Sequence, residues 1–203
     1  QDLSIWYKNL NETLPILSFI RHGKTPLNDG SFLGVGRNPD ILPLESNQIP
    51  TDEFDSIYTG TLQRTISTGA ALKGANEIQD ALLNEINYGS AEGLLYPEVV
   101  EKFPELVEAW KRKEDPKFPG GGESQQDVAE RIDKFIAKIK PENRVAIVTH
   151  NVVIRALIGK ALDLPIRAWF KLNPGHLEKH NFRFFEFFSI FGILRIRKLK
   201  KIK

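Results

Sequence analysis

Two short apolar runs constrain the fold of this chain more than any other feature. The runs span residues 16–20 and 145–148, and neither contains a proline or a glycine. Runs of this length are expected for strands that are buried on both faces of a sheet. Each run is followed within two residues by a histidine, His22 in the first case and His150 in the second. The chain is therefore expected to present two imidazoles at the ends of buried strands.

Helical patterns alternate with these strands. A short strand is expected at residues 56–59, followed by a helix that Thr61 would cap and that would end near Lys73. A stronger helix is expected to begin at Ser124, because Asp127 three residues later gives the spacing of a capping box. The remaining expected elements are two short helices within residues 94–113, a helix at 152–162, and a pair of strands at 182–188 and 193–199.

Strands that alternate with helices indicate an α/β fold, a three-layer α/β/α sandwich with a mostly parallel central sheet. We expect one catalytic domain over residues 1–203, because this length supports a single compact core. In such folds, ligands bind beyond the carboxyl ends of the strands. The two histidines, Arg21 beside the first of them, and Arg64 after the third strand should therefore converge at one edge of the sheet.

Composition narrows the classes of function. The chain has no cysteine, so neither disulfides nor cysteine-ligated metal sites are available to it. Its formal net charge of +2 is too small to indicate nucleic-acid binding, and no apolar run approaches the length of a membrane span. We expect a cytoplasmic protein without a signal peptide. The sequence leaves the oligomeric state open, with a homodimer as one possibility.

The converging groups suit phosphoryl transfer. Arginine binds phosphate oxygens with its planar fork, and Arg21 and Arg64 could supply two such forks, with protonated His150 as a further donor. Neighbouring cations should lower the pKa of His22, which leaves a neutral imidazole that can attack phosphorus.

A proton donor for the leaving group must also be found. Two glutamates, Glu85 and Glu92, lie in a glycine-punctuated segment after the Arg64 helix. A carboxylic acid could protonate the leaving oxygen and later activate water. The residues alone do not choose between the two.

Five ordered segments resemble the histidine phosphatase superfamily, also called the phosphoglycerate-mutase-like family. The first segment fits the family's Arg-His-Gly-x-Thr-x-x-Asn signature. The segments are residues 21–28, 58–70, 83–93, 121–124 and 148–151. The match runs from about residue 17 to residue 162, in the family's order. The small broad-specificity and α-ribazole-type phosphatases are the most similar members.

The resemblance implies a role for each matched residue. His22 would be phosphorylated, Glu85 would be the proton donor, and Glu92 would support the pocket. Arg21, Arg64 and His150 would hold the phosphoryl oxygens, and Asn28 would add a hydrogen bond. Thr25 and the backbone at Asn151 would be further substrate contacts. No metal ion and no organic cofactor are implied.

Some positions depart from the family pattern. Lys24 replaces a common glutamate or glutamine, Asn151 replaces a common glycine, and Gly69 lies near a usual alanine. The helix that usually precedes the second strand should be lost or stunted, because residues 46–50 are short and end in proline. We therefore expect a site that is open on that side.

The resemblance favours a phosphatase that hydrolyses small phosphate monoesters through a phosphohistidine, with a small phosphorylated metabolite as its substrate. The chain lacks the longer segment that cofactor-dependent phosphoglycerate mutases carry after the position of Glu85, and an open site favours hydrolysis. Such a mutase is the alternative function.

Several other residues invite a functional role, but we expect structural ones. We expect His176 and His180 to be surface or hinge residues, and Trp169 with Phe170 to belong to the core. Trp110 is expected to pack in the core rather than to line the substrate pocket.

Overall fold

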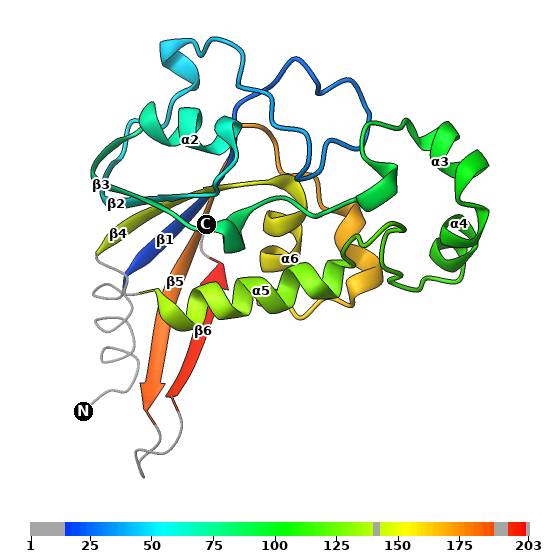
Figure 1. The fold of residues 1–203 in the computed structure, drawn as a ribbon. Helices are drawn as coiled ribbons and strands as arrows, with labels where there is room; N and C mark the ends of the chain where they lie inside the picture. Colours follow the sequence, from blue (N-terminus) through cyan, green and yellow to red (C-terminus); the bar gives the residue numbers. More distant parts are fainter. Residues whose placement is uncertain (1–14, 140–142, 189–194, 202–203) are drawn as a thin grey trace.

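The computed structural model describes residues 15–139, 143–188 and 195–201. Within these residues, six strands form one sheet in the order β3-β2-β4-β1-β5-β6 (Figure 1). The strands are β1 (Ile16–Arg21), β2 (Glu53–Thr59), β3 (Lys73–Gln79), β4 (Arg144–Thr149), β5 (Lys179–Phe188) and β6 (Arg195–Lys201). The first four strands pair in parallel, whereas β5 pairs antiparallel with both β1 and β6. The expected mostly parallel sheet is confirmed.

Helices cover both faces of the sheet, as the expected three-layer sandwich requires (Figure 1). Helix α2 lies over one face, whereas α5 and α6 lie over the other. The short helices α3 and α4 extend to the side, beyond the carboxyl ends of the strands. Their bounds are α2 (Gln63–Ala70), α3 (Tyr96–Lys102), α4 (Pro104–Lys111), α5 (Gln125–Lys138) and α6 (Asn151–Ala161), with 3-10 turns η1 (Ser46–Gln48), η2 (Ala81–Leu83), η3 (Gly89–Ala91) and η4 (Ile166–Lys171).

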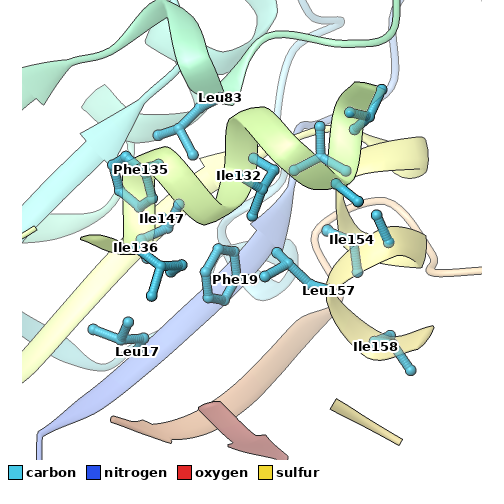
Figure 2. Close-up of a cluster of buried hydrophobic side chains, with 14 of the residues drawn as sticks. Leu17, Phe19, Leu83, Ile132, Phe135, Ile136, Ile147, Ile154, Leu157 and Ile158 are labelled. Carbon is cyan, nitrogen blue, oxygen red and sulfur yellow. The ribbon is translucent and has the colours of Figure 1, made fainter. Parts of the chain in front are cut away.

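The main core lies between the sheet and the helix pair α5 and α6. Phe19 of β1 packs there with Ile132 and Phe135 of α5 and with Leu157 of α6 (Figure 2). Full burial of a side chain of this size contributes about 1.5–3 kcal/mol. This core fixes the central strands β1 and β4, whose ends carry the two histidines.

The capping box of α5 is confirmed. The Ser124 hydroxyl oxygen accepts a hydrogen bond from the Asp127 backbone N–H at 3.1 Å, and the Asp127 carboxylate accepts one from the Ser124 backbone N–H at 2.8 Å. The two bonds satisfy donors that would otherwise be unpaired at the helix start. The start of α5 is therefore well defined.

Helix α2 differs from its expectation at both ends. Its N-cap is Leu62 and its last residue is Ala70, so the predicted Thr61 cap and the predicted end near Lys73 are wrong. The side chain of Thr61 instead bonds to Asn84, which links this turn to the segment that carries Glu85. Strand β3 was missed, because its residues are mostly polar and all exposed, so they show no apolar alternation.

Gly69 lets α2 pack closely on β2. A Cβ at this position would lie 2.6 Å from the Thr59 Cγ2 atom, closer than real Cβ atoms approach. The glycine at a usual alanine position is thus a packing requirement, and it keeps the Arg64 helix against the sheet.

The expected final strand pair is confirmed as β5 and β6, while the turn between them lies outside the described residues. The shortening of the segment before β2 is also confirmed, because η1 is its only helical turn in the described structure. None of the described helices has the length and apolar character needed to cross a membrane.

Candidate active site

The strand register brings the two predicted histidines together. Arg21 at the end of β1 pairs with Thr149 at the end of β4, so the next residue of each strand, His22 and His150, emerges at the same edge. The backbone N–H of His22 donates to the Thr149 carbonyl at 3.0 Å. The centroids of the two imidazole rings lie 5.1 Å apart.

The His22 ring is held as a neutral base. Its Nδ1 atom lies 2.7 Å from the Gly23 carbonyl oxygen, a contact that requires the hydrogen on Nδ1 and leaves a lone pair on Nε2. Burial lowers the pKa of His22 well below its usual value, and the nearby Arg64 and Arg21 cations lower it further. The ring therefore suits nucleophilic attack through Nε2.

Arg64 is fully buried, with 0% exposure, and connects three parts of the site. Its Nε–H donates to His150 Nδ1 at 3.2 Å, while its two terminal nitrogens donate to the carbonyls of Arg37 and Gly34 at 2.9 and 2.7 Å. Because guanidinium has five N–H bonds, two of its hydrogens remain available for an anion.

His150 can act as a donor without being protonated. Burial, and then the neighbouring His22 and Arg64, lower its pKa well below the usual value. Because Nδ1 accepts from Arg64, the hydrogen of the neutral ring is on Nε2. This Nε2 is buried and has no hydrogen-bond partner among the described residues. His150 thus offers a neutral N–H donor, rather than a cation, to a bound oxyanion.

Glu85 is buried beside the start of α6. Its Oε1 accepts hydrogen bonds from the backbone N–H groups of Ile86 at 3.0 Å and Val152 at 3.3 Å. Burial raises the pKa of this carboxyl above its usual value, although the Ile86 hydrogen bond and the Arg64 charge oppose the shift. A carboxyl with a raised pKa holds its proton to higher pH, as a general acid needs.

Glu92, the other candidate acid, is occupied elsewhere. Its two carboxylate oxygens accept from the backbone N–H groups of Val35 and Gly36 at 2.9 and 2.8 Å. Gly34 has a φ of +63°, and a Cβ there would lie 2.1 Å from Glu92 Oε1. Glu92 therefore holds the loop whose carbonyls bind Arg64, and this geometry favours Glu85 as the acid.

The remaining predicted binding residues occupy different positions. Arg21 donates from Nη1 to the Pro174 carbonyl at 2.8 Å, and its buried Nε has no partner among the described residues. Thr25 is buried, and its backbone N–H donates to Asn28 Oδ1 at 2.7 Å. Asn28 therefore braces Thr25. Asn151 begins α6 and has a buried Oδ1 that lacks a partner among the described residues.

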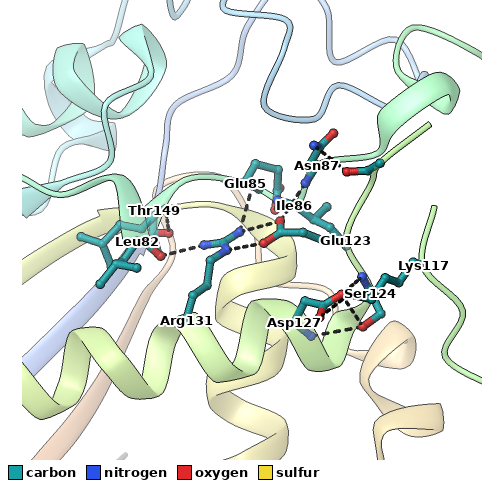
Figure 3. A network of polar contacts seen from close by, with 12 residues as sticks. Leu82, Glu85, Ile86, Asn87, Lys117, Glu123, Ser124, Asp127, Arg131 and Thr149 are labelled. Atoms are coloured by element: carbon teal, nitrogen blue, oxygen red, sulfur yellow. Dashed lines mark hydrogen bonds and ion pairs between the residues drawn. The ribbon is translucent and has the colours of Figure 1, made fainter. Parts of the chain in front are cut away.

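Sequence reasoning missed the ion pair that holds the Glu85 segment. Arg131 of α5 donates to the carbonyls of Leu82 and Glu85 at 2.7 and 3.0 Å, and its Nε bonds to Glu123 Oε1 at 2.8 Å (Figure 3). The other Glu123 oxygen accepts from the Asn87 backbone N–H at 2.9 Å. Glu123 lies in a family-like motif, but nothing in the sequence paired it with Arg131.

The expected placements of three other residues are wrong. His176 lies within the site, with its ring centroid 5.3 Å from that of His22 and its Nδ1 2.9 Å from the His22 carbonyl. His180 is buried on β5 next to β1. Trp169 is buried as expected, but Phe170 is 61% exposed. Trp110, which was expected in the core and not at a pocket, packs against a buried cluster and also lines a cavity.

Two cavities are lined by residues that contact the site residues. One of about 430 Å³ is lined by Lys24, His176 and residues 42–45, and it lies where the shortened segment was expected to leave the site open. The other, of about 720 Å³, is lined by Ile86 and Val152 beside Glu85. In the part of the chain that the structure describes, no group of three His, Cys, Asp or Glu side chains is placed to hold a metal ion.

Curated relatives share the site-bearing part of the chain. The 6-phosphofructo-2-kinase/fructose-2,6-bisphosphatase 1 of Bos taurus is 30% identical over 174 residues, which cover 80% of this chain and 36% of that protein. A related enzyme of Arabidopsis thaliana is matched over only 16% of its length, so the chain spans about a third or less of these relatives. Phosphoserine phosphatase 1 of Hydrogenobacter thermophilus is 28% identical, with 74% and 77% of the two chains covered.

Solved structures agree in fold. A putative alpha-ribazole-5'-P phosphatase from Escherichia coli has a TM-score of 0.70 at 19% identity, with 93% of this chain and 97% of that chain covered. A mycobacterial glucosyl-3-phosphoglycerate phosphatase has a TM-score of 0.67 at 24% identity, with 92% and 98% covered. The sequence profile of the Histidine phosphatase superfamily (branch 1) matches residues 17–185. With this match over most of its length, the chain belongs to the histidine phosphatase superfamily.

Proposed function

We propose that this chain hydrolyses small phosphate monoesters through a phosphohistidine on His22. The observation that carries the proposal is the neutral His22 ring, which lies beside the His150 ring and the Arg64 guanidinium. A nucleophile with a free nitrogen lone pair is thereby surrounded by donors for the oxygens of the group that it attacks.

The first step transfers the phosphoryl group to the protein. The Nε2 lone pair of His22 forms a bond to phosphorus while the bond from phosphorus to the leaving oxygen breaks. The Glu85 carboxyl gives its proton to that oxygen, so the leaving group departs as an alcohol. Arg64, Arg21 and the His150 Nε2–H donate hydrogen bonds to the phosphoryl oxygens, where charge develops.

The second step returns the enzyme to its starting state. The Glu85 carboxylate takes a proton from water as the water oxygen attacks phosphorus, and the bond between phosphorus and Nε2 breaks. Inorganic phosphate leaves, Glu85 is again protonated, and His22 is again neutral. Residues on both sides of the site line open cavities, so water can reach the intermediate. This access supports hydrolysis over transfer to a second substrate hydroxyl.

The proposal is tested by trapping the intermediate. Brief exposure to a ³²P-labelled aryl phosphate should place acid-labile, alkali-stable label on His22, and His22→Asn should lose both the label and turnover. His180→Asn is the matched control, because it removes an imidazole on β5 that lies outside the site, and it should keep the label. Full turnover by the His22 variant would refute the proposal.

The alternative, a cofactor-dependent phosphoglycerate mutase, is tested separately. It requires 2,3-bisphosphoglycerate to prime His22, and it should then interconvert the two phosphoglycerates in a coupled assay. We expect no interconversion beyond the background without enzyme.

A further inference from the structure

The larger cavity beside Glu85 is built from two walls of different character. One wall comes from residues 86–125 with Phe32, and the other comes from α6 and η4. Its volume of about 720 Å³ is within the range of pockets that enclose small organic ligands. Because the cavity begins at Ile86 and Val152, which bond to the proposed acid, it lies where the leaving group of a substrate would extend.

The first wall is a continuous row of aromatic rings. Centroid separations along it are 4.9 Å between Phe32 and Tyr88, 4.7 Å between Tyr88 and Phe118, 5.6 Å between Phe118 and Trp110, and 6.4 Å between Trp110 and Tyr96. The last pair is nearly parallel, with an interplanar angle of 17°. Such a row offers ring faces and edges that favour another planar ring.

Both walls end in aromatic side chains that the protein leaves uncovered. Phe170 of η4 is 61% exposed and Tyr96 of α3 is 54% exposed, which are the two highest values among the exposed large apolar side chains of the described residues. Both line the cavity. Exposed apolar surface beside a pocket is typical of a ligand-binding site, and a bound ring would cover these two side chains.

The polar groups of the cavity favour an anion over a polyol. The carboxylates that could accept hydroxyl hydrogen bonds are already engaged, Glu114 by Arg112 and Asp115 by the backbone N–H groups of Gln125 and Gln126. By contrast, the side chains of Arg167 and Lys171 of η4 line the cavity and have no hydrogen bond or ion pair with another described residue. The charges still unpaired on this wall are therefore positive.

We propose that the natural substrate is a phosphate monoester whose leaving group is a planar aromatic ring that carries an acidic group. The ring lies along the aromatic row and between the uncovered faces of Tyr96 and Phe170, and the acidic group faces Arg167 and Lys171. This assignment rests on the proposed phosphatase function, because it places the phosphate at His22 and the leaving oxygen at Glu85.

The ring is tested by changes in selectivity. The kcat/KM values of the wild type, Tyr96→Leu and Phe170→Leu are measured with phenyl phosphate and with glycerol 3-phosphate. Each variant is compared with the wild type on the same ester, which removes the difference in leaving-group reactivity. We expect each variant to lose about two- to tenfold more on the aryl ester than on the glycerol ester. Leu162→Ala is the matched control, because Leu162 is 53% exposed and does not line this cavity.

The acidic group is tested in the same way with 4-carboxyphenyl phosphate and phenyl phosphate. In the double variant Arg167→Ala/Lys171→Ala, kcat/KM should fall about two- to fivefold more on the carboxylated ester than on phenyl phosphate, as expected for exposed cations. This difference between the two esters should become smaller at high salt, which screens exposed charges. Lys134→Ala, an exposed cation of α5 outside the cavity, is the control.

The outcomes separate this assignment from the function on which it rests. One outcome is that the wild type hydrolyses every ester while Tyr96→Leu and Phe170→Leu lower kcat/KM equally on the aryl and glycerol esters. In that case the ring assignment is wrong and the phosphatase function stands. Equal losses on the charged and neutral aryl esters would overturn the acidic group. Absence of any hydrolysis by the folded wild type would overturn both proposals.

Discussion

The phosphate end of the site and the leaving-group cavity are built on opposite principles. At the phosphate end, His22 is 2% exposed and Arg64 is 0% exposed, and fixed hydrogen bonds hold both side chains. In the cavity, Tyr96 and Phe170 are more than half exposed. A buried, rigid end suits a reaction whose charges must be placed in advance, whereas an open, aromatic end suits discrimination among leaving groups.

The difference teaches where mutations should act. Changes at the phosphate end should lower kcat for every ester, because the same phosphoryl group is common to all of them. Changes in the cavity should alter the ranking of esters. Glu85 is the exception at the phosphate end, because its effect depends on how much the leaving oxygen needs a proton. A variant of Arg64 that changed the ranking of esters, or a cavity variant that abolished all turnover, would contradict this division.

The largest effect after loss of His22 is expected from Glu85→Gln. An amide cannot give a proton to the leaving oxygen, so kcat for an unactivated alkyl ester should fall about 10²–10⁴-fold. An aryl ester with an acidic leaving group should lose less, because its oxygen needs less protonation. Glu92→Gln is the matched control, and it should lose much less because Glu92 bonds only to the loop at residues 35–36. Equal losses in the two variants would contradict the assignment of the acid.

A second effect is expected in stability against pH. Below about pH 6.5, the His22 and His150 rings take up protons when the chain unfolds, but their lowered pKa values keep them neutral in the folded state. Glu85 acts in the opposite sense, because its raised pKa keeps a proton in the folded state that the unfolded state releases above about pH 4.5. His176 acts in the same sense as the other two histidines, because burial also lowers its pKa. Three histidines outweigh one carboxyl, so stability should fall as the pH decreases from about 6.5 to 5.

Urea unfolding at a series of pH values measures how the free energy of unfolding changes with pH, and the variant Glu85→Gln makes the test more specific. Without the opposing carboxyl, the variant should lose stability more steeply as pH falls over the same range. The lowered pKa values of Asp52 and Asp127 do not interfere, because carboxyls of that kind lose their contribution only at lower pH. A flat stability profile from pH 7 to pH 5 would show that the histidines are not held neutral.

The phosphate end could be predicted from the sequence better than the leaving-group cavity. Strands β1 and β4 were predicted because buried strands are apolar throughout, and the parallel register then places His22 beside His150. The assignments of Glu85 and Glu92 stay predictions, although their different hydrogen bonds favour them. The histidine phosphatase family itself is confirmed by the match over residues 17–185.

Other features depend on contacts that leave no local pattern. Strand β3 is an exposed edge strand without apolar alternation, so only its pairing with β2 defines it. His176 contacts His22 because the chain after α6 returns to β1, and the spacing of the two residues gives no sign of it. The cavity joins residues from the loops at 86–125 and from η4, which no single motif contains.

The smallest effect that we predict concerns Arg131, which lies behind the phosphate end and touches neither a phosphate nor the cavity. Arg131→Gln should lower kcat about tenfold with little change in KM, because the carbonyls of Leu82 and Glu85 lose their donor and Glu123 loses its partner. The Arg131 charge also lowers the pKa of Glu85, so the alkaline limb of the pH–rate profile should move to higher pH. Arg131→Lys should restore that limb while recovering kcat only in part, since lysine lacks the planar fork. Lys138, like Arg131, belongs to α5 and forms an ion pair with Asp80. Lys138→Ala is the control, and it should leave the alkaline limb of the pH–rate profile in place. If Arg131→Gln lowers the free energy of unfolding but leaves the alkaline limb of the pH–rate profile in place, Arg131 stabilises α5 and does not tune the acid. The evidence for a distinct reaction end would then come from the Glu85 variants alone.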